Sequence, residues 1–229
     1  MSRSTARGRL WRAGGVAVVC LSMAGPALAH RHRDSRGAAP AGEFSYYLLS
    51  LSWSPTFCAR SPASEECRGP TRHGFVVHGL WPQRERGRLE YCGARERVPA
   101  RVAQGVLDLM PARKLVFHEW KAHGSCSGLR PEAYFDLLRR AAQRVAIPRS
   151  FANARLAQSA SPLRVEGDFM RANPALPTRG LFAVCSRGPD AQLTEVRICM
   201  DRGLAPRMCS ASALAGRCRA PLIRVPAAR

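Results

Sequence analysis

The sequence predicts an α+β fold that is stabilised by disulfide bonds. Segments with strand and helix patterns follow one another without the regular strand–helix–strand rhythm of a parallel sheet. The chain has 229 residues, enough for one domain with a substantial core or for two small ones, and we expect one. Eight of its nine cysteines lie beyond an N-terminal export signal, and this even number in an oxidising compartment favours four disulfides.

Residues 1–29 have the pattern of a secretory signal peptide. Four arginines precede the short apolar stretch VAVVCLSMAG, and the sequence ALA at 27–29 offers a small-residue cleavage site. A membrane anchor is the alternative, but it needs roughly 20 apolar residues, and this stretch is shorter and ends in Gly25-Pro26. We therefore expect an exported protein, periplasmic or extracellular, without a membrane span.

A polar segment separates the signal from the folded part of the chain. Residues 30–42 are rich in Pro, Gly and Ala and lack periodicity, which is typical of a disordered lead-in. Residues 43–229 contain no internal repeat and are expected to form the single domain.

The first half of the domain begins with two strand patterns. FSYYLLSLSW, residues 44–53, is aromatic and apolar enough for a buried strand, and the turn-forming Ser54-Pro55 is expected to end it. GFVVHGL, residues 74–80, predicts a second strand that stops at Trp81-Pro82.

Helical spacing of apolar residues comes next. It begins between Arg95 and Met110, where valines and a leucine recur every three or four positions and Pro111 closes the segment. The clearest helix is predicted over 130–147, with Pro131 in its first turn. The remaining expected elements are a helix over 162–172 and short strands over 180–185, 193–200 and 221–225.

The charge of the chain predicts attraction to polyanions. The formal net charge is +20, and the signal peptide carries four arginines and no acidic residue, so the mature chain keeps +16. Only Lys114 and Lys121 are lysines among the 36 basic residues, which indicates a compositional bias toward arginine. Such a charge favours nonspecific binding and fast association without specifying a partner.

His78 is the better candidate of two histidines near the second predicted strand. His73 and His78 are five positions apart, so in a regular strand their side chains point to opposite faces. His78 lies near the end of the strand, whereas His73 precedes it. A purely structural histidine remains the alternative when His78 is considered alone.

The stretch HEWKAHGSC, residues 118–126, holds two more histidines. On a helix with His118 at 0°, Glu119 lies at about 100° and His123 at about 140°, so these two are i,i+4 neighbours close enough to hydrogen-bond. Trp120 lies at about 200° and is expected to point into the core. Zinc binding of the H-E-x-x-H type requires histidines at i,i+4, and here they are at i,i+5. No C-x-x-C pair exists either, so no metal cofactor is expected.

Together, FVVHGLWP at 75–82 and HEWKAHGSC at 118–126 resemble the two active-site segments of the ribonuclease T2 family of endoribonucleases. SLSWSPTFC at 50–58 also resembles the start of that family's domain. The resemblance implies a mainly antiparallel sheet flanked by helices. It also implies four disulfides: Cys58–Cys67, Cys92–Cys126, Cys185–Cys218 and Cys199–Cys209.

The resemblance further implies roles for the residues of the two segments. His123 would be the general base, oriented by Glu119, and His78 the general acid, although which histidine is the base stays open. His118 would bind phosphate, and Trp81 would stack on a base or, as the alternative, cap the strand from the core. The expected protein is a monomer that cleaves RNA without a metal to 2′,3′-cyclic phosphates and then 3′-phosphates.

Ala122 departs from the family pattern, which usually has lysine before the second motif histidine. Lys121 is adjacent, but a one-residue shift turns it 100° around the helix, to about 160° from His123, so it is at most an accessory residue. Either an arginine from elsewhere supplies the cation or the enzyme is slow. Two other functions therefore stay open: an RNA- or polyanion-binding protein with weak or no catalysis, and a metallohydrolase. Gln83 replaces a residue that is often acidic in relatives, so no base preference is predicted.

Overall fold

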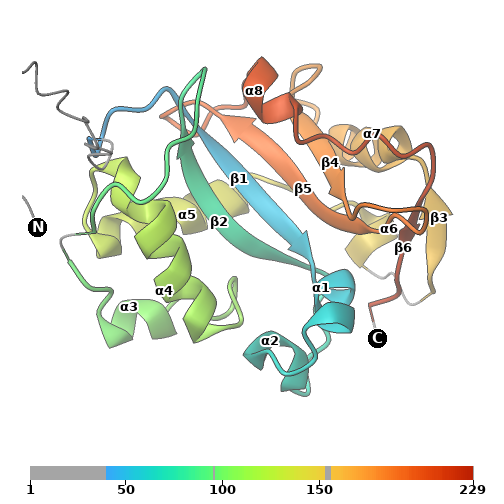
Figure 1. Cartoon of the computed structure of the whole chain (residues 1–229), viewed down its shortest axis with the longest axis horizontal. Coiled ribbons are helices and arrows are strands. Elements are labelled where there is room, and N and C mark those ends of the chain that lie inside the picture. Colours follow the sequence, from blue (N-terminus) through green and yellow to red (C-terminus); the bar gives the residue numbers. More distant parts are fainter. Residues whose placement is uncertain (1–39, 95, 153–155, 229) are drawn as a thin grey trace, which may run out of the picture. The chain divides into compact units, whose positions relative to one another are not determined.

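The computed structural model describes residues 40–94, 96–152 and 156–228. Its main sheet has four antiparallel strands in the order β2-β1-β5-β4 (Figure 1). These strands are β1 Tyr46–Trp53, β2 Phe75–Gln83, β4 Leu181–Cys185 and β5 Leu193–Met200. A small second sheet pairs β3 Gln158–Ala160 with β6 Ile223–Val225. The predicted α+β class with an antiparallel sheet is confirmed.

Helices surround the main sheet. They are α1 Ser54–Arg60, α2 Glu65–Arg68, α3 Ala100–Gln104, α4 Arg113–Ala122, α5 Pro131–Gln143, α6 Arg149–Ala152, α7 Pro162–Ala172 and α8 Ala211–Leu214, with the 3-10 turn η1 Gly124–Ser127. In Figure 1, α4 lies beside β2 and α7 beside β4, while α3 packs against α4. None of the helices in the part of the chain described here is long and apolar enough to cross a membrane.

Side chains alternate along a strand, so the two faces of the sheet carry different residues. On β1, Tyr47, Leu49, Leu51 and Trp53 point into the main core, where α5 and α7 contribute further buried residues. The alternate residues point to the opposite face. There Tyr46 and Leu48 join a small apolar cluster, while Ser50 and Ser52 remain polar. The polar part of this face holds the candidate site.

Of the two predicted strand ends in the first half, the one at Trp53 is confirmed and the one before Trp81-Pro82 was wrong. Ser54-Pro55 starts α1 instead of a turn, because a proline in the first helical turn lacks only an N–H that would have no partner there. Strand β2 continues through Trp81-Pro82 to Gln83, and Pro82 pairs with Tyr47. Proline is tolerated there because β2 is an edge strand of the sheet.

The predicted helix between Arg95 and Met110 is also shorter than expected. In its described part only Ala100–Gln104 is helical. The helix begins after Pro99, because a proline disfavours the helical conformation in the residue before it, and it ends at Gly105. The helices predicted at 130–147 and 162–172 are confirmed as α5 and α7, with α5 ending at Gln143.

Four disulfides connect the domain. They are Cys58–Cys67, Cys92–Cys126, Cys185–Cys218 and Cys199–Cys209, the pairs that the family resemblance implies. The Cys92–Cys126 bridge joins the loop after β2 to the turn η1 that follows α4. The signal peptide predicted at 1–29 and nearly all of the lead-in predicted at 30–42 lie outside the described residues.

Candidate active site

A β-bulge places His78 in the site. Along the β1–β2 pair, Ser50 faces Gly79 and Leu51 faces Val77, so His78 is the extra residue of β2. In a regular strand, His78 and Trp81 would point to opposite faces because they are three positions apart. The extra residue brings both to the polar face, where their ring centroids lie 5.5 Å apart.

Three polar side chains surround the imidazole of His78. Its Nδ1 lies 3.1 Å from Ser52 Oγ and 3.2 Å from Glu195 Oε1, and its Nε2 lies 3.4 Å from Glu119 Oε1. A carboxylate can only accept, so Nδ1 carries the proton in this arrangement. The ring is therefore held by Nδ1, while Nε2 is the nitrogen that faces Glu119.

Glu195, on β5, is anchored independently of His78. Ser50 Oγ donates to its Oε2 at 3.1 Å, and Arg197 Nε donates to the same oxygen at 2.6 Å. Burial by itself would raise the pKa of Glu195, but the hydrogen bond from His78 and the charge of Arg197 lower it to about 2. Glu195 is consequently ionised throughout the physiological pH range.

The surroundings of His78 favour its charged form. Burial alone would lower its pKa, but the hydrogen bond to Glu195 and the negative charges of Glu119 and Glu195 outweigh burial and raise the pKa above its ordinary value. The positive charge of Arg197 reduces this effect without reversing it. The surroundings of His78 therefore stabilise the protonated imidazole relative to a free histidine.

Glu119, on α4, is a buried carboxyl group at the centre of the site. Its side chain is 1% exposed, and Trp81 Nε1 donates to its Oε2 at 2.6 Å. Burial raises the pKa of Glu119 to about 7, against the opposing effects of His78 and the Trp81 hydrogen bond. Gly79 makes this packing possible, because a Cβ atom at that position would collide with Glu119 Oε2 and Trp81 Nε1.

The expected hydrogen bond between Glu119 and His123 was wrong. Helix α4 ends at Ala122, and His123 has φ −126° and ψ −49°, so the ideal helical spacing does not extend to its side chain. Instead, Glu119 contacts Trp81 and His78, and His123 Nδ1 has no hydrogen-bond partner among the described residues. Trp120 does point into the core, as expected.

His123 lies in an environment that favours its neutral form. It is 8% exposed, and its ring stacks on that of Trp81 with centroids 4.8 Å apart. Burial lowers its pKa to about 4, with the charges of His78, His118 and Arg197 adding to burial and that of Glu90 opposing it. The two histidines next to Trp81 thus have pKa values shifted in opposite directions.

A pocket of about 270 Å³ opens beside His78. Its polar lining includes His118 and Lys114 from α4, Ser52 from β1 and Glu66 from α2. Lys114 and His118 are i,i+4 neighbours and therefore share a face of the helix. Lys121 is exposed and does not line this pocket. The structure thus brings His78 and His118 together with a cation that the motifs did not identify.

Ala122 and Trp81 differ from their expected environments. Ala122 is 2% exposed, and its carbonyl oxygen accepts a hydrogen bond from the backbone N–H of Tyr91. Trp81 is 8% exposed, with Arg197 over its ring at 4.8 Å in addition to His123. Little of its surface remains for a nucleobase, so its position matches the core alternative better than base stacking. Gln83 is the last residue of β2 and bonds the carbonyl of Pro82.

Sequence reasoning missed Glu195, Arg197, Ser52 and Lys114. The first two lie on the far side of β1 from His78 in the sheet order, more than 100 positions away in sequence, and no local pattern connects them to it. The alternation in LTEVRICM did carry a signal, because Glu195 and Arg197 are charged residues two positions apart in a mostly apolar strand.

Possible metal ligands do not converge in the described part of the chain. No group of three or more His, Cys, Asp or Glu side chains there has an arrangement that could hold a metal ion.

Two proteins with similar sequences are named as a ribonuclease and a probable ribonuclease. The chain is 41% identical over 128 residues to a ribonuclease of Aeromonas hydrophila, covering 56% of this chain and 58% of that protein. It is 36% identical over 106 residues to a probable ribonuclease of Haemophilus influenzae, covering 39% of each chain. The chain thus spans about half the length of the relatives it matches.

Solved structures share the fold at lower sequence identity. Trichomaglin, an S-like ribonuclease, superposes with a TM-score of 0.65 at 17% identity, over 82% of this chain and all of the other. The self-incompatibility-associated SF11-RNase of Nicotiana alata gives a TM-score of 0.63 at 18% identity over the same shares. The profile of the Ribonuclease T2 family matches residues 44–209, and the chain therefore belongs to the ribonuclease T2 family.

Proposed function

We propose that the protein is an exported, metal-independent endoribonuclease that cleaves single-stranded RNA. The observation that carries this proposal is the placement of His78 and His123 against the ring of Trp81, with ring-centroid distances of 5.5 Å and 4.8 Å, and the opposite pKa shifts of the two histidines support it. Paired titratable groups with pKa values moved apart are the arrangement that acid–base catalysis requires. Membership of the family and the ribonuclease relatives support the same activity.

The chemistry uses the nucleophile that RNA itself carries. His123, neutral above a pKa of about 4, would take the proton of the 2′-hydroxyl, whose oxygen attacks the adjacent phosphorus. His78 would give its proton to the departing 5′-oxygen, leaving a 2′,3′-cyclic phosphate that water then opens to a 3′-phosphate. Lys114 and His118 would bind the phosphoryl oxygens, with Glu119 placing Trp81 and His78.

Export, domain limits and oligomeric state are part of the proposal. The four disulfides fit an oxidising compartment, which supports cleavage of residues 1–29 as a signal and a mature protein in the periplasm or medium. We propose one domain over 43–229, which acts as a monomer on RNA.

Incubation of the mature protein with polymeric RNA in EDTA tests the function. Cleavage that is unaffected by EDTA and ends in cyclic or 3′-phosphates is expected, and DNA should bind but remain intact because it lacks the 2′-hydroxyl. Binding without cleavage would instead favour the alternative of an RNA-binding protein. That alternative arises because Ala122 stands where the family usually has lysine. Loss of activity with EDTA would indicate a metallohydrolase.

The rate of cleavage should depend on pH as a bell-shaped curve. Below about pH 4 His123 becomes protonated and no longer acts as a base, and above the raised pKa of His78 the acid is lost. We expect the highest kcat/KM in mildly acidic to neutral solution, measured on a dinucleotide across the pH range. A maximum above about pH 9 would contradict the assignment of both roles.

Lys114→Met should lower kcat/KM for RNA by about tenfold, because it removes the cation from the pocket of His78 and His118. Lys121→Met is the matched control, since it removes the same charge from the same helix outside that pocket. Steady-state kinetics of both variants on one dinucleotide decides the question. An equal loss in both variants, or a loss only in Lys121→Met, would return the accessory role to Lys121.

A further inference from the structure

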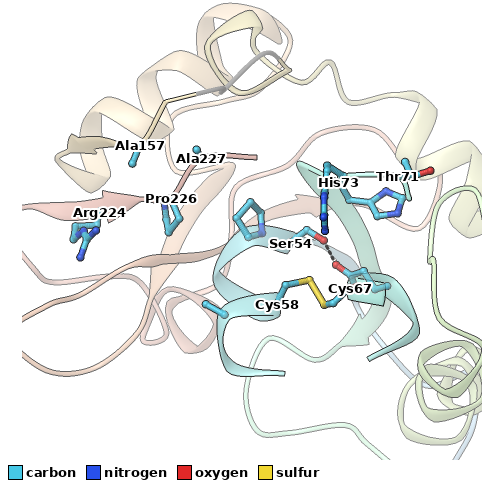
Figure 2. A pocket seen from close by; sticks show the side chains of 13 residues that line it. Ser54, Cys58, Cys67, Thr71, His73, Ala157, Arg224, Pro226 and Ala227 are labelled. Carbon is cyan, nitrogen blue, oxygen red and sulfur yellow. Dashed lines mark hydrogen bonds between the residues drawn. A yellow bond between two sulfur atoms is a disulfide. The ribbon is translucent and has the colours of Figure 1, made fainter. Parts of the chain in front are cut away.

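A second cavity, of about 320 Å³, is lined in part by the disulfide-linked helices α1 and α2. Figure 2 shows Ser54, the Cys58–Cys67 bridge and His73 along one part of its wall, and Arg224 and Pro226 along another. Its size is at the lower end of the range for small-ligand pockets, roughly 300–1,000 Å³. Neither the two motifs nor the proposed chemistry uses this cavity.

One side chain is common to this cavity and the candidate active site. Glu66 lines both the cavity and the pocket that contains His78, His118 and Lys114. The Glu66 carboxylate accepts a hydrogen bond from Ser54, drawn as the dashed line in Figure 2. Burial raises the pKa of Glu66, while the charge of His78 opposes this.

The proposed chemistry indicates on which side of the cleaved bond the cavity would lie. His78 is the proposed acid, and the 5′-oxygen that it protonates belongs to the nucleotide on the 3′ side of the cleaved bond. The pocket lined by His78 is therefore on the side of the departing nucleotide. Because Glu66 lines both, the cavity adjoins the pocket of the departing nucleotide, and the nucleotide after that one would be the next to reach it.

The lining of the cavity suits one nucleotide. Arg72 and Arg224 are exposed on its rim, and neither forms an ion pair within the residues that the structure describes. Such arginines can bind a phosphate. Inside, burial lowers the pKa of His73, which leaves a neutral imidazole able to donate and accept hydrogen bonds to a base. Pro55 and Pro226 supply apolar surface.

We propose that the cavity between α1, α2 and the segment after β6 binds the second nucleotide on the 3′ side of the cleaved bond, with Arg72 and Arg224 on its 5′ or 3′ phosphate. The inference rests on the proposed ribonuclease function, because His78 as the acid sets the direction. It predicts that substrates extended on the 3′ side are cleaved more efficiently than substrates extended on the 5′ side.

Three synthetic substrates test this subsite. One is a dinucleotide, and the other two are trinucleotides extended on the 3′ or the 5′ side, with 2′-O-methyl groups on every ribose except the one at the cleavable bond. The measured quantity is the ratio of kcat/KM for each trinucleotide to that for the dinucleotide. We expect a ratio of at least about fivefold for the 3′ extension, and the double variant Arg72→Gln/Arg224→Gln should reduce it to the ratio of the 5′ extension.

Arg140→Gln/Arg187→Gln is the matched control, because it removes the same charge from exposed positions that line neither cavity. This control should keep the advantage of the 3′ extension. An equal advantage for both extensions, or one that survives in Arg72→Gln/Arg224→Gln, would overturn the proposal.

Calorimetric binding of fully 2′-O-methylated, uncleavable forms of the same substrates separates this proposal from the proposed function. If the protein cleaves no RNA, the proposed ribonuclease function is wrong. The calorimetric binding measurements still test whether the cavity binds a nucleotide. Tighter binding of the 3′-extended form that disappears in Arg72→Gln/Arg224→Gln supports the cavity, and equal affinities in the two proteins overturn it.

Discussion

His123→Ala and His78→Ala are each expected to lower cleavage of RNA by at least about a hundredfold. The first variant removes the neutral imidazole that would take the 2′-hydroxyl proton, and the second removes the charged imidazole that would protonate the 5′-oxygen. Initial rates on polymeric RNA and on a dinucleotide measure the effect. Near-normal rates in either variant would overturn the assignment.

The double variant distinguishes catalysis from a general loss of structure. Residues that act together in one chemical step have non-additive effects, so His78→Ala/His123→Ala should be about as slow as the slower single variant. If the rate loss of the double variant equals the product of the losses of the two single variants, His78 and His123 have independent roles. Because His123 stacks on Trp81, thermal unfolding of each variant should be measured alongside the rates.

Glu195→Gln should move the alkaline limb of the pH–rate profile of cleavage to lower pH by about one unit or more. The ionised Glu195 accepts a hydrogen bond from His78 Nδ1 and raises the pKa of that imidazole, so a neutral amide should let His78 lose its proton at lower pH. The acidic limb, which depends on His123, should stay near pH 4. Full pH profiles of kcat/KM on a dinucleotide measure both limbs.

A merely structural role for Glu195 would lower the whole profile without moving either limb. Glu132→Gln is the matched control, since it removes a carboxylate that pairs with Arg101 on the surface and should change neither limb. Unchanged limbs in Glu195→Gln would show that Glu195 does not set the pKa of His78. Glu195→Asp keeps the negative charge and should retain more of the raised pKa than the amide does.

Much of the fold was predictable because its signals are local. Strand β5 and helix α7 have the predicted bounds, since each is a periodic segment between Gly, Pro or polar breaks. The errors at Pro55, Pro82 and Pro99 have one cause. Whether a proline ends an element or lies within it depends on its place in a helix or sheet, and a single sequence does not show that place.

The site was predictable in its members but not in its contacts. The motifs identified His78, His118, Glu119 and His123, and the structure brings all of them to one region. The partner of Glu119 was wrong because α4 ends one residue before His123, and helix ends depend on the tertiary contacts of the following turn.

The sequence by itself determined the family, the antiparallel α+β class and the residues that carry the proposed chemistry, because motifs and periodicity are encoded in adjacent positions. Only the tertiary structure decided which carboxylate holds which histidine. Glu195 reaches His78 across β1, and the bulge at His78 turns the ring toward it. The opposite pKa shifts of His78 and His123 follow from these contacts and from burial, which exist only in the folded chain.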